Sequence, residues 1–420
     1  MDLPDELVES VLLRLDSSVS LIRAASTCKP WRRIVANAGF LRRSRGLHKP
    51  TVAGYYFDSR PESRFEMLTM GRQIALCFQP SPSAAALAID AGRFSLAFLR
   101  DNDVLPPRWS SSWSVADSRG SLVLLRSLAA AHAPFGFPDL VVCEPLTRRH
   151  RRILPSPDFN TSCYFYGCYL ANGDEAAGEQ PGSSIGISNF RVVYELYRDD
   201  GAWLGRAAVF AAGADGAHSW RETVFGHAIP SFHRMSLMGR AGGSWYFREG
   251  STMAVLDGGT AEFSSSSFAL QEQQPIDPSV YPHDLYIAEG RDGEPRMFTT
   301  TGGILTVFAR ARRPVVAGDG EDEEWAVEKR IRLSEATRGL PGYDASFFFG
   351  GDEPMNVITR GAGFVVLSPR LRTTKEASPA RWWFAVDLET AEVERVHEDL
   401  GMIQFPCELP WPPNLRACVE

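Results

Sequence analysis

Histidine and cysteine are the residue types that most often carry chemistry, and neither recurs here with the spacing of a metal or catalytic site. The eight histidines lack ligand-like spacing, although His227 and His233 lie six residues apart. Cys163 and Cys168 could bind a metal or pair with each other, but they lack partners at zinc-ligand spacing. The chain also lacks a phosphate-binding Gly-x-x-x-x-Gly-Lys-Ser/Thr loop and a His-Glu-x-x-His pair. We therefore expect structural or surface roles for these side chains, with no catalytic residue, no metal and no cofactor.

Length and composition indicate a globular protein with more than one core or with a repeated β architecture. The chain has 420 residues, of which 44% are hydrophobic and 23% charged, and this length exceeds what one hydrophobic core usually supports. Its apolar runs are shorter than the roughly 18 residues of a membrane span. A basic leader followed by an apolar segment is also missing. We therefore expect no membrane partner and a place in the cytoplasm or nucleus, with reduced thiols.

The charge is unevenly distributed along the chain. Residues 1–46 hold eight Lys or Arg against five Asp or Glu, whereas the remainder carries a net charge of -10. An acidic body repels a phosphate backbone, so we expect no nucleic-acid partner. The basic run at residues 148–152, RRHRR, is interpreted as an exposed alternating strand.

The chain begins with an amphipathic segment, LPDELVESVLLRL, at residues 3–15. Its apolar residues recur at i, i+4, i+5 and i+8, which predicts a helix with one apolar face formed by Leu7, Val11, Leu12 and Leu15. A second helix is predicted to start at Ser18 or Ser20 and to be ended or kinked by Pro30. A third segment spans residues 31–43. Three such short helices are too small to enclose all their large apolar side chains, so some should await a partner.

Five separated elements of this segment resemble an F-box domain in order and spacing. They are Leu3-Pro4, Val11-Leu12-x-x-Leu15, Leu21, Cys28-Lys29 and Trp31-Arg32. Asp16 stands where the family often has a second proline, and Ser26-Thr27 where a Val-containing pair is usual. The resemblance implies docking to a Skp-family adaptor, and through it to a cullin scaffold and a RING protein. The alternative is that the apolar stripe packs on the chain's own second domain.

The expected adaptor contacts lie on the apolar side of this module. Burying five or six such side chains would contribute on the order of 10 to 15 kcal/mol before the costs of association are subtracted. The expected contact residues are Leu3, Pro4, Leu7, Val11, Leu12, Leu15 and Leu21, with Trp31 and Ile34 shared between contact and internal support.

Residues 50–420 form a second region of different character. Short apolar runs rich in β-branched and aromatic residues are bounded by Gly, Pro, Asp and Ser, and long helical periodicity is missing. This pattern predicts an all-β domain. The runs begin at residues 121, 139, 190, 206, 243, 253, 284, 304, 324, 363 and 382.

A weak internal repeat predicts the size of the β unit. Acidic residues end three apolar runs and are followed three positions later by threonine, at Glu144, Asp257 and Asp387. A second repeat places tryptophan after a Gly-rich or acidic loop, at Trp220 and Trp325. If these marks recur in every second unit, the unit has about 52 to 65 residues, the size of a propeller blade. The alternative is a pair of β-sandwiches.

Scattered patches of this region resemble the kelch-like β-propeller of plant-type F-box-associated domains. VADSRGSLVLLR, VVCEPLTRRHRRILP and WWFAVDLETAEVERV carry the resemblance. We thus expect a small all-α three-helix F-box at residues 1–46, followed at residues 50–420 by a large all-β domain, a β-propeller of six or seven blades.

The resemblance implies that the β domain captures a target protein for ubiquitination and that the chain is not an enzyme. A carbohydrate- or metabolite-binding propeller and a propeller enzyme are the alternatives. Four tryptophans could line a recognition surface or fill blade cores: Trp109, Trp113, Trp382 and Trp383.

Overall fold

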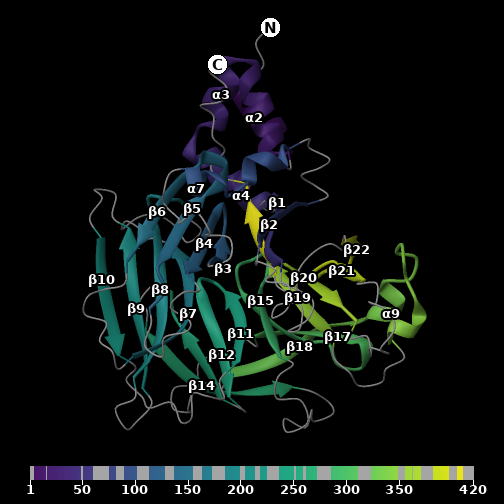
Figure 1. Ribbon diagram of the computed structural model, residues 1–420. Coiled ribbons are helices and arrows are strands. Elements are labelled where there is room, and N and C mark those ends of the chain that lie inside the picture. Colours follow the sequence, from purple (N-terminus) through teal and green to yellow (C-terminus); the bar gives the residue numbers. More distant parts are fainter. Residues whose placement is uncertain are drawn as a thin grey trace, which may run out of the picture. The chain divides into compact units, whose positions relative to one another are not determined.

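The computed structural model of the chain (Figure 1) describes twenty segments. These are residues 4–15, 17–48, 51–59, 75–81, 89–101, 113–127, 137–154, 163–172, 185–198, 204–212, 218–224, 236–249, 252–258, 262–271, 285–310, 323–348, 355–361, 363–369, 382–396 and 404–409. The chain divides into two compact units. Unit 1 comprises Met1–Tyr194, Val209–Arg221 and Gln404–Glu420, and unit 2 comprises Glu195–Ala208 and Glu222–Ile403. The expected domain boundary between residues 46 and 50 stays a prediction.

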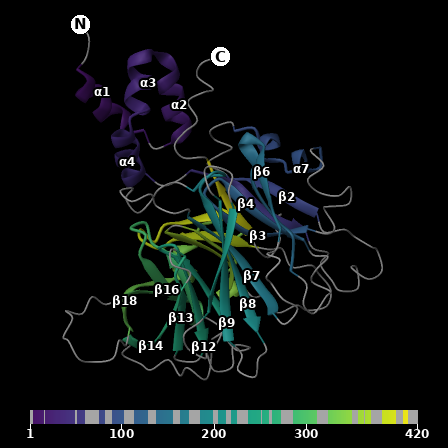
Figure 2. The ribbon, with the colours of Figure 1, turned by 90° about the vertical axis from the view of Figure 1, so that its left-hand side faces the viewer.

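Short helices open unit 1 (Figure 2), and the described residues contain four where the sequence pattern predicted three. They are α1 (Asp5–Leu12), α2 (Ser18–Thr27), α3 (Lys29–Val35) and α4 (Ala38–Leu47). The expected third segment divides because the Asn37 side chain caps a new helix, accepting hydrogen bonds from the backbone N–H groups of Gly39 and Phe40. Ser17 caps α2 in the same way, and the helix starts at Ser18, one of the two predicted positions.

Pro30 begins a helix instead of ending one. The second helix stops at Thr27, Cys28 adopts an extended conformation, and Pro30 occupies the first turn of α3. A proline is compatible with this position because the first N–H groups of a helix have no intrahelical partner.

The helices share a small apolar core. Its buried members come from all four helices: Leu12, Leu21, Ala24, Ala25, Ile34, Val35 and Phe40. Four short helices can exclude water only by giving most of their large side chains to this core, which leaves few for the surface.

Antiparallel sheets form the rest of unit 1. One three-stranded sheet has the order β2-β1-β23, so a strand near the end of the chain pairs with the first one. A four-stranded meander, β3 to β6, follows. A second one, β7 to β10, begins in unit 1, and its strands β8, β9 and β10 are each divided between the two units. The strands are β1 (Val52–Ser59), β2 (Ala75–Pro80), β3 (Trp113–Arg119), β4 (Leu122–Ser127), β5 (Leu140–Glu144), β6 (Arg149–Ile153), β7 (Cys163–Asn172), β8 (Phe190–Arg198), β9 (Leu204–Ala212), β10 (His218–Val224) and β23 (Gln404–Glu408).

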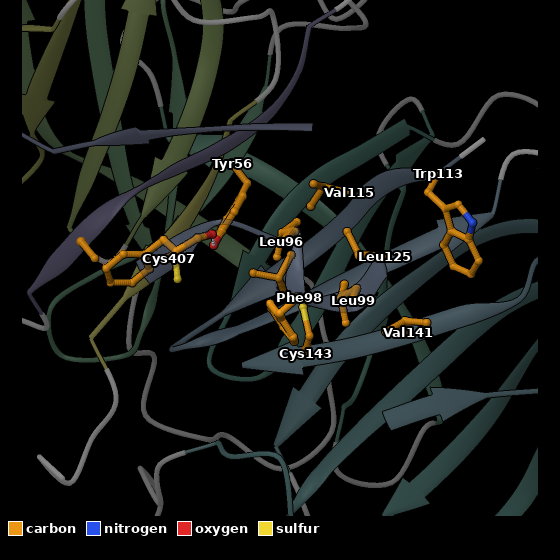
Figure 3. Packing of buried hydrophobic residues seen from close by; sticks show 13 residues of the cluster. Tyr56, Leu96, Phe98, Leu99, Trp113, Val115, Leu125, Val141, Cys143 and Cys407 are labelled. Carbon is orange, nitrogen blue, oxygen red and sulfur yellow. Dashed lines mark hydrogen bonds between the residues drawn. The ribbon is translucent and has the colours of Figure 1, made fainter. Parts of the chain in front are cut away.

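An apolar cluster ties these first strands to short helical turns (Figure 3). The turns are η1 (Ala91–Phe94), α7 (Phe98–Asp101) and η3 (Pro145–Thr147). The Tyr56 hydroxyl donates to the Phe94 carbonyl oxygen at 2.5 Å, and the rings of Phe78 and Phe94 stack at 4.8 Å. Cys143 and Cys407 lie in the same cluster as buried thiols.

Unit 2 contains three further meanders. Strands β11 to β14 and β15 to β18 are linked by two parallel pairings, β11 with β15 and β14 with β18, which close the eight strands into one sheet. Strands β19 to β22 form a separate sheet. The strands are β11 (Ser236–Ala241), β12 (Ser244–Glu249), β13 (Thr252–Leu256), β14 (Phe263–Gln271), β15 (Tyr286–Glu289), β16 (Pro295–Thr299), β17 (Ile304–Arg310), β18 (Glu323–Arg332), β19 (Asn356–Gly361), β20 (Phe364–Ser368), β21 (Trp383–Asp387) and β22 (Val393–Val396). Short turns are η5 (Thr301–Gly303), α9 (Leu333–Ala336) and η6 (Ala345–Phe348). The region after the helices is therefore largely β, as predicted.

The sequence repeats mark equivalent turns in alternate meanders. Glu144 ends β5, Asp257 follows β13 and Asp387 ends β21, so each stands after the third strand of its meander. Trp220 and Trp325 lie on β10 and β18, the fourth strands of the two intervening meanders. The marks thus fall in alternate meanders, while the repeated blade-sized unit stays a prediction; Thr260 lies outside the described residues.

A β-bulge recurs on the first strands of three meanders. The register shifts between Val115 and Asp117 on β3, between Leu237 and Gly239 on β11, and between Val357 and Thr359 on β19. A bulge leaves its extra residue outside the ladder, so the carbonyl of that residue becomes available to other donors.

Of the two roles left open for the four tryptophans, the three described residues have the core-filling one. Trp113, Trp382 and Trp383 are buried, and Trp109 lies outside the described residues. The physical reason is their large apolar area, because a tryptophan side chain stabilises the fold most when it is removed from water.

Among the described residues, no helix is long and apolar enough to cross a membrane.

Candidate functional site

The first helix presents an apolar face to solvent. Leu7 and Val11 lie one turn apart and are 54% and 56% exposed, and the exposed Pro4 precedes the helix on its N-terminal side. We call Pro4, Leu7 and Val11 the α1 face. Large apolar side chains this exposed are uncommon in pairs at i, i+4 spacing unless a partner covers them.

The opposite side of α1 is attached to the other helices. Val8 and Leu12 pack into the helical core. Asp5 forms an ion pair of 2.7 Å with Arg33 on α3, Glu9 forms another with Arg43 on α4, and His48 forms a 2.6 Å hydrogen bond to the Leu13 carbonyl oxygen. Exposed ion pairs stabilise little. Because they reach two different helices, however, they fix which side of α1 faces solvent.

The structure divides the expected contact residues into two groups. Leu12 and Leu21 are each 1% exposed and Ile34 is buried, so the helical core uses these side chains. Leu15 and Trp31 are half-buried at the edge of that core. Pro4, Leu7 and Val11 remain open to solvent, while Leu3 lies outside the described residues.

Sequence reasoning missed one exposed apolar residue of this module. Leu47, at the end of α4, is 65% exposed. The fourth helix was not separated from the third in the sequence pattern, so no face could be assigned to Leu47. The cap residue Asn37, followed by a run of helix-compatible residues, was the available signal.

The described residues contain no group of three or more His, Cys, Asp or Glu that could hold a metal ion. Cys163 and Cys168 belong to strand β7, as expected. Residues 182–186 match the Gly-x-Ser-x-Gly motif of a nucleophile elbow. It precedes a turn and strand β8 instead of a helix, whereas a nucleophile elbow stands between a strand and a helix.

The basic run at residues 148–152 forms a strand, as predicted. Arg149 pairs with Glu144 at 2.7 Å and Arg152 pairs with Asp139 at 2.7 Å on strand β6 and its neighbours. Arg151 lies over the ring of Phe210. Three of the four arginines of the run, Arg149, Arg151 and Arg152, thus have contacts within unit 1, whereas Arg148 is exposed and precedes the strand.

Comparison with known proteins identifies the helical module. Residues 1–47 match the family model described as F-box-like. No curated protein matches the chain. Among solved structures, oligopeptidase B from Leishmania major is similar at 10% identity and a TM-score of 0.29, over 85% of this chain and 53% of that chain. The chain thus spans about half the length of that protein, and a likeness this low supports no conclusion. The chain has an F-box-like domain at its N-terminus, followed by a β-rich region.

Proposed function

We propose that this protein is a substrate-recognition subunit of a Skp-cullin-F-box ubiquitin ligase, acting in the cytoplasm or nucleus. The observation that carries the proposal is the exposure of Leu7 and Val11 in a module that matches the F-box-like family. An F-box-like domain implies binding to a Skp-family adaptor, and the α1 face is the surface that we assign to it. The adaptor would connect the chain to a cullin and a RING protein.

The α1 face supplies only part of the free energy that a stable, reversible complex needs. Burying a Leu or Val side chain stabilises by roughly 1.5 to 3 kcal/mol. Leu7 and Val11 together therefore contribute about 3 to 6 kcal/mol, so further contacts are needed to exceed the cost of association. Leu3, Leu15, Trp31 and the newly found Leu47 are the residues that we propose to supply them.

The role proposed for the β region is to hold a target protein. Counted over the described residues, it contains one three-stranded sheet, three four-stranded sheets, and one closed eight-stranded sheet that joins two further four-stranded meanders. Six units of this size are what a six-bladed β-propeller would contain, and the alternating turn marks support a single repeated unit. Such a chain performs no bond chemistry. It raises the effective concentration of target lysines near a ubiquitin-loaded enzyme.

The test is a pull-down of a purified Skp-family adaptor by the full chain. We expect Leu7→Asp and Val11→Asp each to abolish binding, because a carboxylate cannot be buried in an apolar contact without a partner. Leu154→Asp is the matched control, since Leu154 is 58% exposed but directly follows strand β6, outside the F-box-like module. Its binding should equal that of the unaltered chain.

Two outcomes would contradict the proposal. Undiminished adaptor capture by both α1 variants would remove the α1 face from the interface. Failure of the unaltered, folded chain to bind any Skp-family adaptor would remove the ligase role altogether.

A further inference from the structure

Lysine is rare in this chain, although positive charge is not. The sequence contains four lysines and 40 arginines, and residues 50–328 contain no lysine. The two side chains carry the same charge but differ in chemistry. A lysine amine can lose its proton and attack a carbonyl carbon, whereas the guanidinium of arginine stays protonated and is not a nucleophile. The β region is therefore rich in cations and poor in amines.

Arginine supplies the exposed positive charge of the β region. Among the described residues of this region, ten arginines are exposed and no lysine is. Arg338 is exposed, and the exposed Arg93 forms an ion pair of 3.9 Å with Asp90. Exposed ion pairs stabilise little, and substitutions at such surface positions change stability little. The stability of the fold therefore does not explain why arginine, and not lysine, occupies positions such as these.

Lys329 is the one lysine among the described residues of the β region, and its amine is engaged. This half-buried side chain on β18 donates hydrogen bonds to the carbonyl oxygens of Leu388, at 3.3 Å, and Glu389. Both acceptors lie between β21 and β22 in the same compact unit. The nitrogen is thus held against backbone, and it could reach a reaction partner only after both bonds had broken.

Lys29 differs from Lys329 in both position and exposure. It is exposed and begins α3 in the F-box-like module. Lys49 and Lys375 lie outside the described residues. Within the described part of the chain, the exposed lysine amine is therefore in the module that we assign to adaptor binding, and the region that we assign to the target protein has none.

Ubiquitin transfer makes the choice between lysine and arginine consequential. A deprotonated lysine amine attacks the carbonyl carbon of the thioester that joins ubiquitin to a carrier cysteine. A C–N isopeptide bond forms, the C–S bond breaks, and the amine proton passes to the released thiolate. A receptor that holds a target beside this thioester also holds its own surface there at a high effective concentration. Arginine on that surface cannot accept ubiquitin.

We infer that the lysine-poor surface of the β region keeps this receptor from being ubiquitinated by its own ligase. The inference rests on the proposed ligase role. Exposed arginines provide charge without an acceptor amine, and Lys329 keeps its amine in hydrogen bonds to the backbone. Ubiquitin is thereby directed to the lysines of the captured target, and the receptor is spared for further rounds of transfer.

The experiment reconstitutes the ligase without a target protein. The mixture contains the full chain, a Skp-family adaptor, a cullin and RING protein, the activating and conjugating enzymes, ubiquitin and ATP. The double variant Arg93→Lys/Arg338→Lys places one new amine in each compact unit. We expect it to be ubiquitinated about tenfold faster than the unaltered chain, because each new amine shares the effective concentration of the assembly. Mass spectrometry should locate the added ubiquitin at positions 93 or 338.

Arg93→Gln/Arg338→Gln is the matched control, since it removes the same two guanidinium groups and adds no amine. It should be modified as slowly as the unaltered chain. Lys329→Arg should also leave the rate unchanged, and a slower rate would show that the Lys329 amine is an acceptor, against the inference.

Adaptor capture and melting temperature are measured on the same samples. Equal modification of the unaltered chain and the lysine variant, with capture and melting temperature also equal, would overturn the inference and leave the ligase role intact. Failure of the unaltered chain to capture an adaptor would overturn both.

Discussion

Leu7 and Leu12 lie on the same helix, five residues apart, yet Leu7 is 54% exposed and Leu12 is 1% exposed. The helical repeat of 3.6 residues places their side chains about 140° apart. One apolar stripe in the sequence therefore contains residues of two kinds. Those at positions 8 and 12 hold the module together, and those at positions 7 and 11 are available to a partner.

Leu12→Ala should destabilise the helical module, whereas Leu7→Ala should not. Removing a buried leucine costs about 2 to 5 kcal/mol, and an exposed one costs within about 0.5 kcal/mol. Amide hydrogen exchange of α2 and α3 in the full chain measures the difference. We expect lost protection in Leu12→Ala alone, and equal loss in both variants would contradict the division of the stripe.

The α1 face was predictable as part of an apolar stripe but not as a set of residues. Apolar periodicity identifies α1 as an amphipathic helix, but core packing and partner binding use the same residue types. Leu21 illustrates the difficulty: its place in the F-box pattern predicted a contact, and the small core needed the same side chain. Only the three-dimensional positions of α3 and α4 decide which residues are enclosed.

The β region was predictable where its strands are apolar. The run at residues 363–369, for example, contains β20 (Phe364–Ser368). Strand β14 was not predicted, because its serines resemble a loop in composition. Its backbone pairs with β13 over five residues, from Thr252 opposite Ser267 to Leu256 opposite Phe263, and such pairing leaves no mark in a single sequence.

Asp387→Ala should destabilise the turn that the sequence repeat identified. The Asp387 carboxylate accepts hydrogen bonds from the backbone N–H groups of Glu389 at 3.0 Å and Thr390 at 2.9 Å, and it pairs with Arg291. Loss of these contacts should lower the free energy of unfolding by about 1 to 3 kcal/mol.

Asp387→Asn is the control for this turn, because its amide oxygen can still accept both backbone bonds while the ion pair with Arg291 is lost. Chemical denaturation should rank it between the unaltered chain and Asp387→Ala. A loss as large as that of the alanine variant would show that the ion pair, and not the turn, carries the stability.

The buried thiols of Cys143 and Cys407 should make unit 1 sensitive to alkaline pH. Burial raises the pKa of each thiol far above its ordinary value of 9.0. Above pH 9 the folded state keeps these protons while the unfolded state releases them. The free energy of unfolding is therefore unaffected by the two thiols below pH 9 and decreases as the pH rises above it. Each thiol should reduce the free energy of unfolding by about 1.4 kcal/mol per pH unit in that range.

Cys407→Ala should make the decrease in the free energy of unfolding with pH less steep by the contribution of one thiol. This expectation holds whatever the effect of the substitution on stability at neutral pH. Denaturation at a series of pH values above 9 measures it. An unaltered slope in Cys407→Ala would mean that its thiol ionises in the folded protein.

Trp325→Phe should cost less stability than Trp382→Phe, although the two side chains are matched in most respects. Both are buried, and each has an arginine over its ring, Arg310 at 5.8 Å and Arg395 at 5.6 Å. They differ in the indole N–H. That of Trp382 donates to the Pro341 carbonyl oxygen at 3.0 Å, whereas that of Trp325 has no hydrogen-bond acceptor within the described structure.

Phenylalanine lacks this donor, so the substitution removes a satisfied group at one position and an unsatisfied one at the other. Both variants lose similar apolar area, and the cavity cost therefore cancels in the comparison. The remaining difference should be about 1 to 3 kcal/mol, the cost of leaving the Pro341 carbonyl unpaired together with the gain from deleting a buried unpaired N–H. Equal midpoints in urea denaturation would show that the Trp325 indole finds an acceptor, such as a bound water molecule.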